Sequence, residues 1–182
     1  MNLHIELDAS HPAFEWLNQQ ADKLGARGHF GTHIDCYTKK PLLPHYEVYV
    51  YQLDCREGMP SEDELRGLPY LGGKALLLHT GNMYENDYGT KAYFGRRDAL
   101  LTKASLEIIL EKRPAFILID SFGIGTHGEN HQMLDKRCEE FDCFVIENII
   151  VEAGKESNIE RIAIDFDLDH PSTGKPCTVK TI

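Results

Sequence analysis

The sequence predicts an α/β fold in a single domain, residues 1–182, with a mixed sheet and crossover helices. Two observations predict it. Strand-like and helix-like segments alternate along the second half of the chain, and the length fits one domain of ordinary size. There is no internal repeat and no Pro/Ser-rich linker. Hydrophobic residues make up 42% of the sequence and charged residues 26%, which is typical of a globular protein with a sizeable core.

Four elements are predicted in the first part of the chain. Residues 3–7 fit a short strand, and apolar residues at helical spacing predict a helix over 12–24. Residues 46–53 (YEVYVYQL) alternate and are rich in aromatic and β-branched side chains, so they predict a second strand. Ser61-Glu62-Asp63-Glu64 is a capping box that opens a short helix ending by Gly67.

The remaining elements follow in a regular order. Residues 74–79 predict a buried strand, and the polar, aperiodic stretch 82–98 is typical of a lid or a binding loop. Thr102 caps a helix over 103–112, which Pro114 stops. The last predicted elements are a strand at 116–120, a helix at 130–138, and strands at 144–149, 159–168 and 177–182. This order predicts strand–helix–strand crossovers in the second half and β-hairpins elsewhere.

Charge and composition exclude several classes of function. Lys and Arg total 19 against 29 for Asp and Glu, a net charge of −10, which disfavours binding to nucleic acid. No apolar run approaches the roughly 20 residues that cross a bilayer, and the first residues do not resemble a signal peptide. The five cysteines are scattered without a CxxC pair, as in a reducing compartment. We therefore expect a cytoplasmic protein that binds a small molecule, with no nucleic-acid or membrane partner.

The segment Gly28–Asp35 (GHFGTHID) carries the main chemical signal. It places His29, His33 and Asp35 at i, i+4 and i+6, and its glycines argue against a helix. In an extended segment His33 and Asp35 point to the same side. Two imidazoles and a carboxylate suit zinc or manganese. On spacing alone, two surface histidines beside a glycine turn are an equally good interpretation.

Further metal ligands are available in the second half of the chain. His131 opens a predicted helix after a glycine-rich loop, and Glu147 ends the apolar strand FVIE. A carboxylate in such a strand is costly unless it is paired or bound to a metal. Taken singly, Glu147 also fits a strand-end partner of a surface Arg or Lys, and His131 fits a surface residue at a helix start.

Together these segments resemble the cyclase family of metal-dependent hydrolases, which includes bacterial kynurenine formamidases and isatin hydrolase. The segment GHFGTHID is similar to the family signature H-x-G-T-H-x-D-x-P-x-H. Stretches similar to other family landmarks follow in the same order along most of the chain: LDASHP at 7–12, LLHTG at 77–81, IDS at 119–121, HQML at 131–134, IENI at 146–149 and GKPCTV at 174–179.

The resemblance implies a metal centre and a fold. Its metal ligands would be His29, His33, Asp35, His131 and Glu147. One or two divalent ions would bind per chain, commonly zinc or manganese, with a carboxylate able to bridge them. The implied fold is a swivelling β/β/α arrangement, assembled as a homodimer or homotetramer in which a neighbouring chain helps to form the pocket.

The chain departs from the signature at its last position. Where the family has Pro-x-His, this chain has Tyr37-Thr38-Lys39, so a lysine replaces the final histidine. Three interpretations follow: Lys39 acts as base or electrostatic stabiliser, His45 takes over the role, or formamidase chemistry is weakened or absent. Asp35 is the other candidate for proton transfer.

The expected function is hydrolysis of a small amide, formamide, lactam or lactone, in which metal-activated water attacks the carbonyl. The alternative is a metal-binding protein of the same fold that has lost hydrolysis and binds a small molecule.

Overall fold

Seven strands of the computed structural model close into one sheet, in the order β1-β5-β4-β3-β2-β6-β7. The structure describes the whole chain except residues 6, 8, 13, 25 and 26. The strands are β1 (His33–Asp35), β2 (His45–Asp54), β3 (Ala75–His79), β4 (Phe116–Ile119), β5 (Phe144–Glu147), β6 (Arg161–Phe166) and β7 (Gly174–Thr181). Strands β2 to β5 run parallel to one another. Strand β1 pairs antiparallel with both β5 and β7, and β6 pairs antiparallel with β7. The predicted single-domain α/β fold with a mixed sheet is confirmed.

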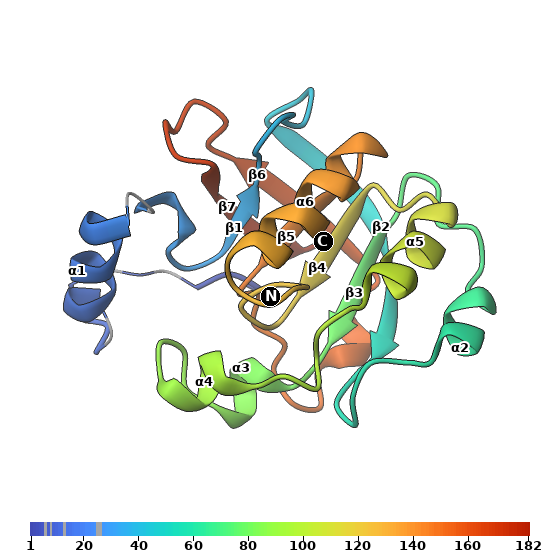
Figure 1. The fold of residues 1–182 in the computed structure, drawn as a ribbon, viewed down its shortest axis with the longest axis horizontal. Helices are drawn as coiled ribbons and strands as arrows, with labels where there is room; N and C mark the ends of the chain where they lie inside the picture. Colours follow the sequence, from blue (N-terminus) through green and yellow to red (C-terminus); the bar gives the residue numbers. More distant parts are fainter. Residues whose placement is uncertain (6, 8, 13, 25–26) are drawn as a thin grey trace.

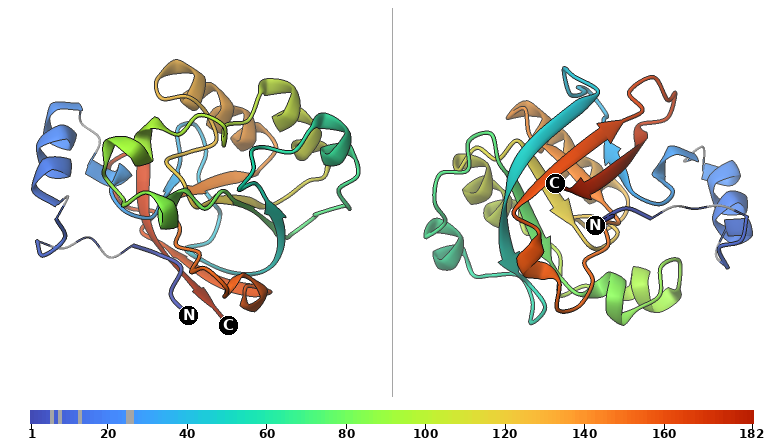
Figure 2. Two further views of the ribbon diagram at one scale, coloured as in Figure 1. Left: turned by 90° about the horizontal axis from the view of Figure 1, so that it is seen from below. Right: turned by 180° about the vertical axis from the view of Figure 1, so that it is seen from behind.

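The helices lie outside this closed sheet. They are α1 (Phe14–Leu24), α2 (Glu62–Arg66), α3 (Asn82–Glu85), α4 (Lys91–Gly95), α5 (Lys103–Glu111) and α6 (Glu129–Glu140), with 3-10 turns η1 (Arg27–His29) and η2 (Glu156–Asn158). Helices α5 and α6 lie in front of strands β3 to β5, while α1 stands to one side, beyond β1 (Figure 1). Seen from behind, β2, β6 and β7 form the face turned away from α5 and α6 (Figure 2).

Strict alternation along the buried strands divides the core in two. In β3 and β4, Leu77 and Leu118 point into the closed sheet, where they meet residues of β6 and β7. Their neighbours Leu76 and Ile117 point outward and pack under α2, α5 and α6. Because both faces are covered, these strands carry near-continuous apolar runs. The sequence therefore shows them as buried strands without a polar face.

Local signals that the sequence carries are confirmed at the helix starts. The Ser61 hydroxyl accepts from the backbone of Glu64, whose side chain returns to the Ser61 backbone, completing the capping box. The Thr102 hydroxyl caps α5 by accepting from the Ser105 backbone. The crossovers predicted in the second half are present, and a further one, containing α2, links β2 to β3.

Two predictions about local structure are wrong. The stretch 82–98 contains α3 and α4, because Thr90 caps α4 and Tyr93 anchors it in the interior, fully buried. Residues 3–7 form no regular strand in the part of the segment that the structure describes. Within this segment His4 forms an isolated bridge to Ile149, and Asn2, just before it, forms one to Lys180. In the described part of the chain, no helix is long and apolar enough to span a membrane.

Candidate metal centre

The candidate centre begins where β1 pairs with β5. His33 lies directly opposite Glu147, and Ile34 lies opposite Ile146. Ile34 and Ile146 pack inside the closed sheet, so by alternation His33, Asp35 and Glu147 lie on its outer face. On that face Val145, two residues before Glu147, packs with residues of α6. The register therefore places three potential ligands underneath α6.

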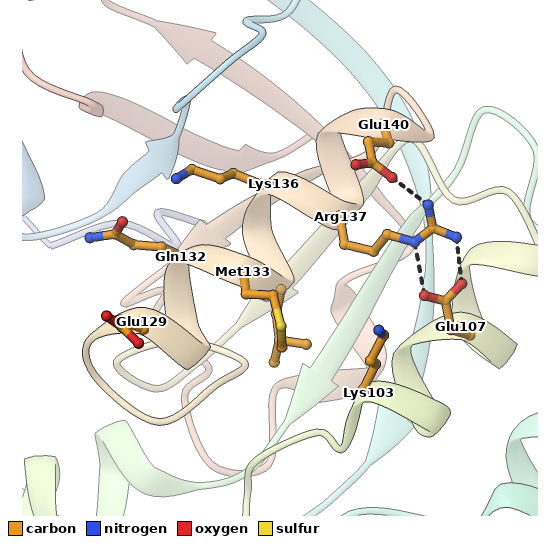
Figure 3. A pocket seen from close by; sticks show the side chains of 9 residues that line it. Lys103, Glu107, Glu129, Gln132, Met133, Lys136, Arg137 and Glu140 are labelled. Carbon is orange, nitrogen blue, oxygen red and sulfur yellow. Dashed lines mark hydrogen bonds and ion pairs between the residues drawn. The ribbon is translucent and has the colours of Figure 1, made fainter.

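Helix α6 presents one buried acidic and basic stripe to these residues. His131, Asp135 and Glu139 recur every four residues and are all buried. The opposite face of α6 borders a groove with α5, where Arg137 pairs with Glu107 at 2.8 Å (Figure 3). This ion pair on the outer face and the buried stripe on the inner face fix the rotation of α6.

The first group of ligand atoms comes from the GHFGTHID segment. His29 Nδ1 lies 3.1 Å from Asp35 Oδ1 and 3.2 Å from His33 Nε2. His33 Nε2 lies 3.8 Å from the same Asp35 oxygen. One ligand atom from each of these residues lies within 4.8 Å of the others. The structure thus brings together the three residues whose spacing suggested a metal site.

The second group adjoins the first and surrounds His131 Nε2. This nitrogen lies 3.3 Å from Asp35 Oδ2, 3.2 Å from Asp135 Oδ2 and 3.4 Å from Glu147 Oε1. The other Glu147 oxygen, Oε2, lies 3.5 Å from His33 Nε2. Asp35 and Glu147 therefore each turn one oxygen toward each group. Two adjoining positions share two carboxylates.

The donor atoms fit a divalent cation. In the described part of the chain, both oxygens of Asp35, both of Asp135 and Oε1 of Glu147 are buried without a hydrogen-bond partner. The pKa values of Asp135 and Glu147 are raised well above the usual range, mainly by burial and next by repulsion from Asp35. Acceptor atoms that converge without donors are costly in a protein interior. A bound cation would offset that cost.

Hydrogen bonds on the far side of the His29 and His33 rings orient their candidate ligand nitrogens. His33 Nδ1 lies 3.0 Å from the Gly31 carbonyl, which only accepts, so Nδ1 carries the proton and Nε2 is free to bind a metal. Burial lowers the pKa of His33 to about 4, which keeps the ring neutral at neutral pH. His29 Nε2 lies 2.9 Å from Thr173 Oγ1, leaving Nδ1 toward the centre. Both rings are therefore held in ligand orientation.

Glycine is required where the loop before α6 passes the centre. Gly123 has φ +133°, and a Cβ there would lie 2.5 Å from Glu147 Oε1 and 2.5 Å from His131 Cε1. Any side chain would displace one of these two residues. The glycine-rich loop seen in the sequence thus allows a close approach of backbone to the ligands.

The segment 82–98 supports the ligand loop from behind. The Tyr88 hydroxyl accepts from the Gly31 backbone at 2.9 Å, and the Tyr93 hydroxyl donates to Asn148 Oδ1 at 2.6 Å. Asn148 Nδ2 in turn donates to the Gly31 carbonyl at 2.9 Å. Two tyrosines of this segment thus support the Gly31 peptide, whose carbonyl orients His33.

Two of the predicted catalytic residues do not join the cluster. Lys39 Nζ donates to Asp142 Oδ1 at 2.9 Å, and its side chain is 47% exposed. His45 Nδ1 lies 2.8 Å from Asp165 Oδ1, and its side chain is 52% exposed. Both side chains contact a carboxylate at the surface. Of the three residues predicted to handle a proton, the structure places only Asp35 among the ligand atoms.

Sequence reasoning missed two buried acids on α6. The signal for Asp135 was available: it follows His131 at i+4, so the two side chains share a helix face. Glu139 accepts hydrogen bonds from the three backbone N–H groups of residues 37–39. It thereby joins α6 to the loop that follows β1. Nothing in the sequence links Glu139 to that loop.

Comparison with known proteins gives a match to fold alone. No family model and no curated protein matches the chain. A solved structure described as a potential metal-dependent hydrolase with cyclase activity matches with a TM-score of 0.66 at 15% identity, over 98% of this chain and 94% of that one. An isatin hydrolase bound to the product analogue thioisatinate matches with a TM-score of 0.61 at 14% identity, over 85% and 73%. A predicted metal-dependent hydrolase from Bacillus stearothermophilus matches with a TM-score of 0.57 at 18% identity, over 84% and 76%. The chain therefore has the fold of these proteins.

Proposed function

We propose that the protein is a metal-dependent hydrolase that cleaves a small amide, formamide, lactam or lactone. The observation that carries this proposal is the pair of adjoining ligand groups that share Asp35 and Glu147. The fold supports it, because similar structures are described as metal-dependent hydrolases and one as an isatin hydrolase. Isatin is itself a lactam.

The proposed ligands divide between two positions. His29 and His33 serve the first, His131 serves the second, and Asp35 and Glu147 reach both. We propose zinc or manganese, one or two ions per chain, because imidazole and carboxylate together suit both metals. A divalent ion bound here would lower the pKa of bound water toward 7 and polarise the scissile carbonyl.

The remaining residues of the centre position the ligands. Asp35 directs its two oxygens at different histidines, so we assign it a shared ligand role in addition to any part in proton transfer. The proton-transfer roles of Lys39 and His45 stay predictions. Each would require its side chain to leave a carboxylate partner at the surface before it reached substrate.

An aromatic groove adjoins the centre and is suited to a small flat substrate. It is lined by side chains that include Trp16, Phe94 and His127. The His127 ring lies 5.9 Å from the ring of His131, and it stacks on Phe122 at 4.9 Å. Apolar walls beside a polar reacting centre are typical of small-molecule sites.

A second candidate function is metal-dependent binding of a small molecule without hydrolysis. The observation that favours it is Lys39, which replaces the final histidine of the signature and pairs with Asp142 on the surface. This candidate predicts bound metal with no turnover. Hydrolysis predicts turnover of at least one formamide, lactam or lactone.

We also propose a cytoplasmic homodimer or homotetramer. All five cysteines are free and buried, which supports a reducing compartment. Light scattering coupled to size exclusion tests the assembly, and a monomer at all concentrations would exclude it.

The experiment that tests the metal-dependent function is elemental analysis of protein purified without chelator or histidine tag. The His33→Ala variant is measured beside it. We expect one or two zinc or manganese ions per chain, reduced in the variant, and a screen of N-formylkynurenine, isatin and simple lactones then follows. Absence of stoichiometric metal after reconstitution would exclude both candidate functions.

A further inference from the structure

We propose that Asp135 is a metal ligand, and that it makes the second position of the centre oxygen-rich and selective for a hard ion such as manganese. This inference rests on the proposed metal centre and deepens it. It assigns a role to a residue that the signature does not contain. It also gives the two positions different metal preferences.

The geometry places Asp135 among the ligands of the second position. Its Oδ2 lies 3.2 Å from His131 Nε2. One ligand atom from each of Asp35, His131, Asp135 and Glu147 lies within 4.8 Å of the others, and all four residues are buried. Asp135 is 1% exposed, so water does not solvate its carboxylate. The polar surroundings of this carboxylate are therefore the other residues of the cluster and not solvent.

Other buried acids in the chain show what a structural carboxylate looks like. Asp120 accepts from the Thr80 backbone at 2.6 Å, the Thr80 hydroxyl at 2.7 Å and the Gly81 backbone at 2.9 Å. Glu139, one helical turn beyond Asp135, accepts from the backbone of residues 37–39. In the described part of the chain neither oxygen of Asp135 accepts any hydrogen bond. A carboxylate without donors at a ligand cluster indicates cation binding.

The residue at the last position of the signature does not contribute to this cluster. Lys39 directs its ammonium to Asp142 and supplies no lone pair to the centre. Asp135 reaches the cluster from α6. The second position then has one imidazole, from His131, and oxygens from three carboxylates.

The difference in donors predicts a difference in metal. The first position has two imidazoles, from His29 and His33, which suit zinc. Carboxylate oxygens suit manganese and magnesium, and three of them at one position favour such ions relative to a nitrogen-rich site. We therefore expect the ratio of manganese to zinc affinity to be higher at the second position than at the first.

The test is titration of metal-free protein with manganese, followed by the loss of the free-ion EPR signal, then competition with zinc. Asp135→Asn keeps the shape and removes the charge. We expect it to weaken one of two manganese sites by tenfold or more and to leave the other unchanged. Asp142→Asn, which removes an exposed carboxylate, is the matched control and should bind both ions as the wild type does.

Two further measurements separate a ligand from a structural residue. Metal-free Asp135→Asn should be at least as stable as metal-free wild type, because neither oxygen of Asp135 accepts a hydrogen bond that the substitution would remove. A structural carboxylate would leave the variant less stable. Asp135→His supplies a nitrogen in place of the oxygens and should shift the second position toward zinc.

The outcomes distinguish this inference from the proposed function. Two bound ions in the wild type with unchanged manganese affinity in Asp135→Asn would overturn the role of Asp135 and leave the metal centre standing. Equal manganese-to-zinc ratios at both positions of the wild type would overturn the selectivity, whether or not the variants fold. No metal bound by the wild type would overturn the proposed function itself, and this inference with it.

Discussion

The Glu139 carboxylate joins two segments that carry candidate metal ligands. From α6 it accepts hydrogen bonds from the Thr38 backbone at 2.7 Å, the Lys39 backbone at 2.9 Å, the Tyr37 backbone and the Thr38 hydroxyl. Glu139 is 1% exposed. Replacing it with alanine leaves three backbone N–H groups without an acceptor and opens a cavity at the joint. We predict that Glu139→Ala is strongly destabilised.

The magnitude follows from the number of hydrogen bonds. Bonds to a charged acceptor contribute about 1.5–3 kcal/mol each, but water replaces part of the loss at the rim of the loop. We expect Glu139→Ala to lower the free energy of unfolding by about 3–5 kcal/mol. In a chain of this length that corresponds to a fall in Tm of about 6–20 °C. Glu139→Gln keeps one acceptor oxygen and should lose about half as much.

The assay is urea denaturation of metal-free protein followed by circular dichroism. The control is Glu140→Ala on the same helix turn, because Glu140 pairs with Arg137 at the surface and its side chain is 61% exposed. A surface pair contributes about 0–1 kcal/mol. If Glu139→Ala lowered the free energy of unfolding by less than about 1 kcal/mol, or by no more than Glu140→Ala does, the Glu139 carboxylate would not stabilise the contact between α6 and the loop after β1.

Four further predictions follow from the structure. His33→Ala should lose metal from the first position while the far-UV dichroism stays unchanged, and full metal content in this variant would exclude the first ligand group. Gly123→Ala should cost about 2 kcal/mol or more in denaturation and reduce metal content, since a Cβ displaces His131 or Glu147; wild-type behaviour would contradict the close approach. Lys39→Met should keep the metal content of the wild type, whereas loss of metal would show that Lys39 acts at the centre. Burial lowers the pKa of His79, but its hydrogen bond to Asp120 outweighs this and raises the pKa overall, so its stabilisation is complete below about pH 6.5 and declines as the pH rises through the raised pKa. The stability difference between wild type and His79→Gln should therefore shrink from pH 6 to pH 9, and a difference independent of pH would refute the pairing.

Local sequence signals predicted the elements whose cause is local. Hydrogen-bonding side chains at Ser61 and Thr102 set helix starts within one turn, so a short window of sequence contains the whole interaction. The buried strands could be predicted because a short apolar run bounded by turns mainly forms a buried strand in an α/β chain. The stretch 82–98 failed as a prediction because its short helices depend on the burial of Tyr93, which the rest of the fold provides.

The sequence by itself predicted the candidate metal ligands and the face that two of them share. Alternation along an extended segment is enough to put His33 and Asp35 on one side, and the structure confirms that they lie together. Tertiary structure alone decided that β1 pairs with both β5 and β7, that His33 lies opposite Glu147, and that α6 brings Asp135 to the same cluster. These contacts join residues that are roughly 100 to 140 positions apart. These contacts form because the sheet closes and both of its faces are buried. The free energy of that burial comes from the whole chain, so no local sequence pattern can predict it.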